Sequence, residues 1–141
     1  MFLHVLLAVF ATPFVTSETN VGSVVLDEVT FEKIVPKHEI VLVKFDQMYP
    51  WGNHLKEYKK LVETLSAHER ILLAEVPIAD FGEKQNAKLA QRFKVKTKTY
   101  DYPQYRLFLR EKGLDNAIGR FTKQKLLRMS VHGVLSELFK C

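Results

Sequence analysis

Cysteine is nearly absent from this sequence: among 141 residues the one cysteine is Cys141, the last residue. An internal disulfide is therefore excluded, and so is thiol–disulfide exchange that needs an attacking and a resolving thiol in one site. Two interpretations of the terminal thiol stay open. It can pair with a thiol of a second chain, or it can mark the point at which a longer chain was cut short.

Other marks of catalysis are missing too. The five histidines include no pair at metal-ligand spacing and no HExxH motif, and Gly-rich phosphate loops do not occur. Asp80 and Glu83 are too few for a calcium loop. The net charge of +5 is spread over interspersed cations and anions. This pattern indicates a solvated surface, with a phosphate-binding face as the alternative, and it contains no nucleic-acid motif. We expect no catalytic residue, metal or cofactor.

The first seventeen residues contain no Lys, Arg, Asp or Glu. Their apolar stretch, residues 2–14, is too short to span a membrane. Val15 and Ser17 suit the −3 and −1 positions of a signal-peptidase site, with cleavage before Glu18. An N-terminal core helix is disfavoured because the segment has no polar face. We expect a signal peptide over residues 1–17 and a soluble mature chain over 18–141, with no membrane contact after cleavage.

The centre of the chain is the stretch from Val41 to Leu61, in which an apolar strand pattern passes through an aromatic turn into a helical pattern. Around it the periodicity predicts a short strand at 24–26, a helix at 27–35 capped by Asp27, and a strand at 40–45. Next come a helix from Asn53, a strand at 71–76 and a helix at 86–93. A hairpin of strands 104–110 and 117–121 and a last helix after Thr122 complete the order βαβαβαββα. This α/β order, with a mixed central sheet between helices, is that of the thioredoxin-like fold.

Four segments of the sequence carry a closer resemblance to a known family: GSVVLDEVTFEKIVPK, VLVKFDQMYPWG, LLAEVPIADFGEKQN, and the YP pair before the hairpin. From about Gly22 onward the chain resembles the endoplasmic reticulum resident protein 29 and Windbeutel family, the redox-inactive relatives of protein disulfide isomerase. On the thioredoxin pattern, the two redox cysteines would fall at Pro50 and Asn53. The carboxylate beneath them would be Lys44, and the cis proline would be Pro103.

With no thiol in the turn, a binding surface remains. Tyr49, Pro50 and Trp51 lie on the turn, and Tyr102 and Pro103 precede the hairpin. An extended peptide could pair with the backbone edge before the proline and place its side chains on these aromatics. Tyr100 and Tyr105 flank the same proline. The alternative is that most of these rings belong to the core, although a tight turn favours exposure of Tyr49 and Trp51.

The resemblance implies an escort for unfolded or partly folded secretory proteins in the endoplasmic reticulum lumen, without enzymatic activity. It also implies a homodimer with contacts at Gly22 and Asp27, and Asp27 can cap a helix at the same time. The resemblance also implies a second, all-helical domain and a retention signal of KDEL type, and neither follows residue 122 here. Two explanations stay open: the sequence is incomplete or a splice product, or the protein works as a bare thioredoxin-like domain. Two alternatives stay open: a secreted or luminal interaction domain without chaperone activity, and a thiol oxidoreductase that uses Cys141 between chains.

Overall fold

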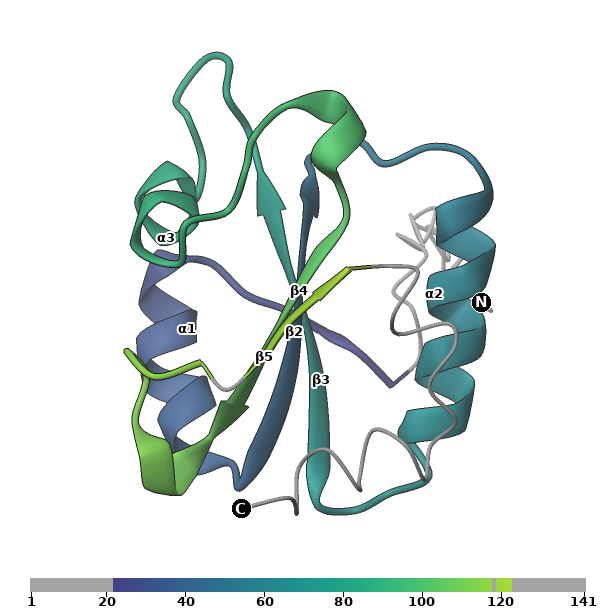
Figure 1. Cartoon of the computed structure of the whole chain (residues 1–141), viewed down its shortest axis with the longest axis vertical. Helices are drawn as coiled ribbons and strands as arrows, with labels where there is room; N and C mark the ends of the chain where they lie inside the picture. Colours follow the sequence, from purple (N-terminus) through teal and green to yellow (C-terminus); the bar gives the residue numbers. More distant parts are fainter. Residues whose placement is uncertain (1–21, 118, 123–141) are drawn as a thin grey trace, which may run out of the picture.

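One sheet of five strands runs through the described part of the chain, residues 22–117 and 119–122 of a computed structural model (Figure 1). Its strands are β1 (Val24–Val25), β2 (Ile40–Gln47), β3 (Ile71–Ile78), β4 (Gln104–Leu109) and β5 (Gly119–Thr122). The spatial order is β1-β3-β2-β4-β5. The first three strands are parallel, whereas β4 runs antiparallel to β2 and β5. The predicted mixed sheet is therefore confirmed.

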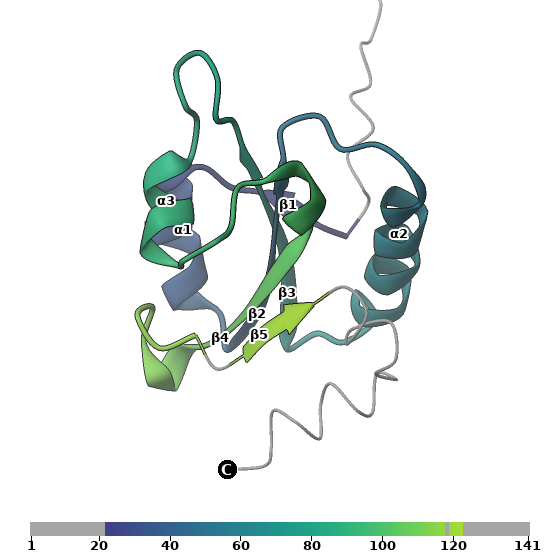
Figure 2. The same cartoon turned by 45° about the horizontal axis from the view of Figure 1, so that its top comes forward.

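Helices cover both faces of this sheet. They are α1 (Glu28–Ile34), α2 (Asn53–Leu65) and α3 (Ala87–Arg92), with the short 3₁₀ helices η1 (Val35–Lys37), η2 (Thr99–Asp101) and η3 (Arg110–Lys112). α1 and α3 lie on one face and α2 on the other, as two views show (Figures 1 and 2). The order agrees with the predicted thioredoxin-like fold as far as β5. The predicted last helix and Cys141 lie outside the described residues.

β2 is the central strand, and its apolar residues are buried on both faces. Successive side chains point to opposite faces of a strand. Val41, Val43 and Phe45 accordingly pack with the α1 and α3 side, and Ile40 and Leu42 with the α2 side. The strand thus forms the wall between two apolar layers, and its carboxyl end carries the aromatic turn.

The first helix begins where the sequence predicts. The carboxylate of Asp27 accepts the backbone N–H groups of Val29 and Thr30 at 2.9 and 2.7 Å, and the Thr30 hydroxyl accepts the N–H of Asp27 at 2.8 Å. This reciprocal arrangement is a capping box, which satisfies N–H groups that have no partner inside the helix. Phe31 and Val35 are buried one turn apart and fix the helix to the sheet.

Element ends differ from the predicted ones where long-range pairing decides them. β2 and β3 continue together past the predicted ends, since Asp46 pairs with Pro77 and Gln47 with Ile78. β5 begins at Gly119, two residues later than the predicted strand. Among the helices of the described region, none combines the length and the apolar character that a membrane crossing requires.

Candidate functional site

The aromatic turn connects β2 to α2 at the carboxyl end of the parallel strands. The backbone N–H of Met48 donates to the carbonyl of Ile78 at 3.0 Å, so the turn is fixed to the end of β3. Gly52 has φ = 91° directly before α2, a conformation that favours glycine. The chain reverses there and leaves Tyr49 75% and Trp51 66% exposed. The predicted exposure of these two rings is confirmed.

The backbone beside the turn contains the predicted cis proline. The Tyr102–Pro103 bond is cis, and Tyr102 itself has an extended backbone (φ = −84°, ψ = 154°). Pro103 is buried and Tyr102 is half-buried. Because β4 starts at the next residue and pairs with β2 from Phe45, this segment lies at the same sheet edge as the turn. The turn that carries Tyr49 and Trp51 and the Tyr102–Pro103 segment thus lie at one edge of the sheet.

Charge beneath the turn differs from that of a redox site. Lys44, at the position of the expected carboxylate, is 1% exposed. Its ammonium lies 3.1 Å from an oxygen of Asp46, 3.9 Å from one of Glu75, and 4.1 Å from the centre of the Tyr58 ring. The other oxygen of Asp46 accepts the N–H of Gln47 at 2.8 Å. The buried cation is therefore surrounded by two carboxylates and a π face, and it is joined through Asp46 to the end of β2.

The tyrosines around this charge group are held in their neutral form. Burial, followed by the charge of Glu75, raises the pKa of Tyr58, whose hydroxyl is 2.8 Å from that of Ser23. Burial also raises the pKa of Tyr102 to about 12, with further contributions from Asp80, Asp46 and Asp101.

Two further tyrosines, Tyr105 and Tyr100, flank Pro103 in the sequence. Tyr105 is 4% exposed and packs at 6.3 Å from the Tyr58 ring, so it is a core residue. The pairing of β4 turns Tyr105 toward α2. The sequence distance between Tyr105 and Pro103 does not reveal this direction. The side chain of Tyr100 lies outside what the structure describes.

Sequence reasoning missed Phe81. It lies on the loop of residues 79–86, called here the Phe81 loop, at the carboxyl end of β3, and it is 60% exposed. The N–H of Ala79 donates to the carbonyl of Gln85 at 3.1 Å, and the N–H of Lys84 to that of Phe81 at 3.3 Å. The Asn86 side-chain amide donates to the carbonyl of Pro77 at 2.6 Å. The sequence offered one indication of this exposure: Phe81 is a single aromatic residue between Asp80 and Gly82 at the end of a strand.

The Phe81 loop and the aromatic turn lie on opposite sides of the segment that leads into β4 (Figures 1 and 2). This arrangement follows from the sheet, because β3 and β2 are neighbours and both end at this edge. Three well-exposed aromatic residues, Tyr49, Trp51 and Phe81, therefore lie on two loops at the sheet edge where the Tyr102–Pro103 segment leads into β4. We call Tyr49, Pro50, Trp51, Phe81 and the Tyr102–Pro103 segment the aromatic surface.

Gly22 and Asp27 lie apart from the aromatic surface. Gly22 has φ = 100°, and a Cβ built on it would lie 3.0 Å from the Cβ of Ser66 and 3.2 Å from Val62 Cγ1. These two residues are at the far end of α2 from the turn. Both predicted dimer residues therefore have a structural reason within the chain: close packing on α2 for Gly22 and the helix cap for Asp27.

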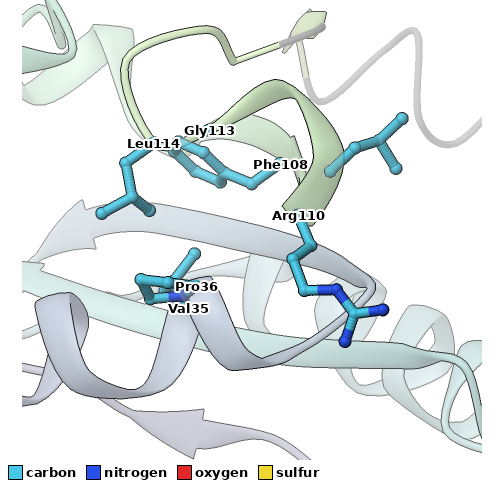
Figure 3. Close-up of a pocket in the computed structure, with 7 residues that line it drawn as sticks. Val35, Pro36, Phe108, Arg110, Gly113 and Leu114 are labelled. Atoms are coloured by element: carbon cyan, nitrogen blue, oxygen red, sulfur yellow. The ribbon is translucent and has the colours of Figure 1, made fainter.

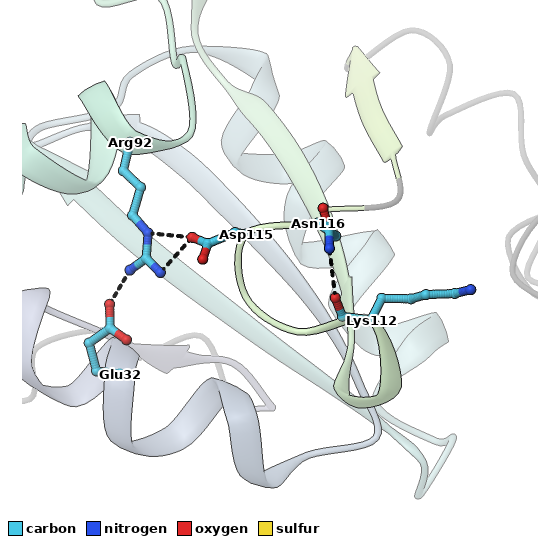
Figure 4. Close-up of polar contacts among 5 residues, drawn as sticks. All are labelled: Glu32, Arg92, Lys112, Asp115 and Asn116. Carbon is cyan, nitrogen blue, oxygen red and sulfur yellow. Dashed lines mark hydrogen bonds and ion pairs between the residues drawn. The ribbon is translucent and has the colours of Figure 1, made fainter.

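Two features lie away from this edge. A small pocket between η1 and the β4–β5 connection is lined by Val35, Pro36, Phe108, Leu109, Arg110, Gly113 and Leu114 (Figure 3). Nearby, Arg92 of α3 pairs with Glu32 of α1 and with Asp115, the latter at 2.8 Å (Figure 4). These pairs join two helices to the hairpin. In the described region no three His, Cys, Asp or Glu side chains meet as a metal site.

Comparison with known proteins identifies the family to which this chain belongs. Residues 18–128 match the family model described as ERp29, N-terminal domain. The chain belongs to the ERp29 N-terminal domain family. It is 36% identical to the protein Windbeutel of Drosophila melanogaster over 98 residues, which are 67% of this chain and 37% of that protein. The chain thus spans little more than a third of that relative.

Solved structures agree on the fold. The short form of thioredoxin f from spinach chloroplast has a TM-score of 0.59 at 15% identity, covering 86% of this chain and 98% of that one. The first thioredoxin domain of mouse protein disulfide-isomerase A4 has a TM-score of 0.57 at 21% identity, covering 83% and 76%. At these identities the likeness shows the thioredoxin-like fold alone. This ERp29-family chain has that fold with Pro50 and Asn53 in the turn and one cysteine in the whole sequence.

Proposed function

We propose that this chain is a non-enzymatic escort of secretory proteins in the endoplasmic reticulum lumen, and that it binds unfolded or partly folded cargo at the aromatic surface. The observation that supports this most is the exposure of Tyr49 and Trp51, at 75% and 66%, beside the cis proline. Large aromatic rings in water are unfavourable unless a partner covers them, and contiguous exposed apolar area is a mark of binding sites.

Binding would join backbone pairing to side-chain contact. Tyr102 is extended and lies at the start of β4, so a cargo segment in extended form can lie along it as a short added strand. Its side chains alternate along such a strand, and those on one side reach the rings of Tyr49 and Trp51. Such a mode depends on backbone and aromatic contacts, so it tolerates many sequences, as an escort of diverse cargo requires.

The same residues argue against thiol chemistry. Pro50 and Asn53 supply neither an attacking thiolate nor a resolving thiol. At the position of the carboxylate in thioredoxins, the ammonium group of Lys44 is paired with Asp46. We expect no reduction of insulin by this chain, and the same result for Cys141→Ser. Activity that disappears in Cys141→Ser would instead support the oxidoreductase that acts between chains.

We further propose that the chain forms a homodimer through the β1 edge. β1 is one of the two outer strands of the sheet. Val25 in this strand and Val29 at the start of α1 are 62% and 61% exposed. In the sequence Gly22 precedes Val25, and Asp27 lies between the two valines. An outer strand with apolar side chains offers unpaired backbone groups to a second copy. This edge also favours the second candidate function, a luminal or secreted dimerisation domain without chaperone activity.

The test is suppression of aggregation of a reduced, unfolded secretory protein, run with wild type, Tyr49→Ala and Trp51→Ala. Both variants should keep their circular dichroism, because the two side chains are mostly in water, and both should lose most of the suppression. Lys60→Ala, which removes an exposed side chain on α2 outside both proposed surfaces, is the control and should behave as wild type. Full suppression by both turn variants would show that cargo binds elsewhere on the chain. Absence of suppression by wild type would contradict the escort function and favour the dimerisation domain without chaperone activity.

A further inference from the structure

The positive charge of this chain is concentrated in one stretch of the sequence. Residues 84–98, which comprise α3 and the residues on either side of it, hold six cations and no carboxylate (Figure 2). The cations are Lys84, Lys88, Arg92, Lys94, Lys96 and Lys98. The stretch thus has a formal charge of +6, while the whole chain has +5, so the remaining residues together carry −1. An anionic partner is therefore attracted to this part of the chain.

Two lysines of the connection from α3 to η2 have no neutralising partner in the described part of the chain. Arg92 of the same stretch pairs with carboxylates of α1 and of the hairpin, so its charge is already compensated. The side chains of Lys94 and Lys96 are exposed, and no ion pair joins either of them to a described carboxylate. Lys98 is exposed as well. Alternate residues of this connection therefore present ammonium groups to solvent.

Lys94 occupies a backbone position that favours glycine. The N–H of Val95 donates to the carbonyl of Ala90 at 2.8 Å, and the N–H of Lys94 donates to that of Gln91 at 3.2 Å. These two hydrogen bonds form a Schellman motif, which ends α3 with Lys94 in the left-handed region at φ = 52°. Glycine adopts this conformation without a steric cost, so the backbone of the helix end does not require a lysine. A residue that departs from the local backbone preference is typical of functional positions.

The connection after this motif is held in place by two residues of β4. The guanidinium of Arg106, which is 4% exposed, donates to the carbonyl of Lys94 at 3.4 Å. The side chain of Gln104 accepts the N–H of Lys96 at 3.3 Å and donates to its carbonyl at 2.7 Å. Val95, between the two lysines, is buried. The ammonium groups thus extend from a fixed backbone, so little conformational freedom of the main chain is lost on binding.

We propose that Lys94, Lys96 and Lys98, called here the lysine segment, bind an acidic segment of a partner protein. The N–H groups of residues 94–96 all donate within the chain, so they are not available to pair with a strand or to surround a phosphate group. Recognition is left to the lysine side chains, whose ammonium groups donate to carboxylates in many directions. Two residues of an extended chain span about 7 Å, so alternate lysines and the alternate acidic residues of an extended partner have similar spacing.

This partner differs from a membrane and from the cargo. Membrane-binding amphipathic segments place apolar side chains beside their cations, whereas Val95, the apolar residue within the lysine segment, is buried. The cargo proposed above contacts Tyr49 and Trp51, which lie on the turn between β2 and α2. The inference therefore does not rest on the proposed function, and it adds a second binding surface of different chemistry.

The experiment measures fluorescence polarisation of two labelled ten-residue peptides, one of alternating Glu and Ser and the other of alternating Gln and Ser. We expect the Glu peptide to bind wild type about tenfold more tightly than the Gln peptide at about 0.05 M salt, the range of a few exposed charge contacts. Raising the salt to about 0.5 M should remove most of this difference. Vesicles of phosphatidylserine and phosphatidylcholine test the membrane as the alternative partner.

A triple variant locates the binding. Lys94→Gly, Lys96→Gln and Lys98→Gln together remove three charges from the lysine segment. The circular dichroism should stay unchanged, because glycine suits the left-handed position and the other two side chains are exposed. This variant should bind the Glu peptide as weakly as wild type binds the Gln peptide.

The matched control is Lys56→Gln, Lys60→Gln and Lys112→Gln together, which removes the same charge from exposed sites on α2 and η3 and should keep most of the preference. Equal loss in both triple variants would show that net charge alone causes the preference and would overturn the inference. Equal binding of the two peptides by wild type would also overturn it. So would vesicle binding that depends on the lysine segment while the Glu peptide does not bind, because the partner would then be a membrane.

Discussion

Lys44 is a buried charge in the central strand of the sheet. A lysine in a central strand pattern looks like a surface residue or a break in the strand, yet it is 1% exposed and the strand continues to Gln47. Two carboxylates and the Tyr58 ring surround its ammonium, and Asp46 connects it to the backbone at the start of the aromatic turn. A buried charge is tolerated only with such partners.

Replacing Lys44 by Met should therefore destabilise the chain strongly. The side chain keeps its length, but Asp46, at 5% exposure, is left as a buried carboxylate without its closest cation. Breaking a buried pair in this way costs about 3–5 kcal/mol. Urea unfolding followed by circular dichroism measures the loss. Lys56→Met, on the exposed face of α2, is the control and should change the free energy of unfolding by about 0.5 kcal/mol or less. Equal effects would show that the buried pair contributes nothing.

At the scale of elements, prediction succeeded where the determinants are local. α1 needs a cap and an apolar face, and Asp27, Phe31 and Val35 provide both within nine residues. The predicted ends of β2 and β3 were wrong because the true ends depend on pairing with a strand thirty-one residues away, with Asp46 opposite Pro77. Tyr105 was misplaced for a related reason: the ladder with β2 decides which face it occupies. Phe81 was missed because its exposure results from hydrogen bonds that close a loop, and composition does not reveal these.

The cap of α1 should make stability depend on pH in a defined direction. Hydrogen bonds from Thr30, then from Val29, hold the pKa of Asp27 below its ordinary value of 3.8. A lowered pKa means that the folded state prefers the ionised form, so this contribution is complete above pH 3.8 and is lost as the pH falls through the lower folded-state pKa. Asp27→Ala should thus lower the urea midpoint clearly at pH 7 and less at a pH near 3.

Asp27→Asn separates capping from charge. Asparagine is a good N-cap, so this variant should keep most of the stability at neutral pH and lose the dependence on acid. If the dimer needs the charge of Asp27, the same variant should be folded and weakly associated. An Asp27→Ala loss of equal size at both pH values would contradict the assignment of the lowered pKa to the cap.

For the whole molecule, the structure separates two surfaces that sequence reasoning had placed on one chain without relating them. The aromatic surface lies at the carboxyl ends of β2 and β3, and the β1 edge lies along the side of the sheet, where Gly22 packs on the far end of α2. A dimer through β1 would therefore leave both aromatic surfaces open. Two linked sites can hold one long unfolded chain at two points, and the effective concentration of the second site strengthens binding.

Val25→Lys tests this arrangement. Val25 is 62% exposed on the outer strand, and a lysine on such an edge opposes pairing with a second copy while remaining solvated in the monomer. Sedimentation equilibrium over a concentration series should show a dimer for wild type and a monomer for Val25→Lys, with unchanged circular dichroism. Phe81→Lys places the same charge on the aromatic surface and should stay dimeric. The monomer should bind a short tyrosine peptide as wild type does and hold a long unfolded chain more weakly, because only the long ligand reaches two sites. A Val25→Lys dimer as tight as wild type would place the interface elsewhere.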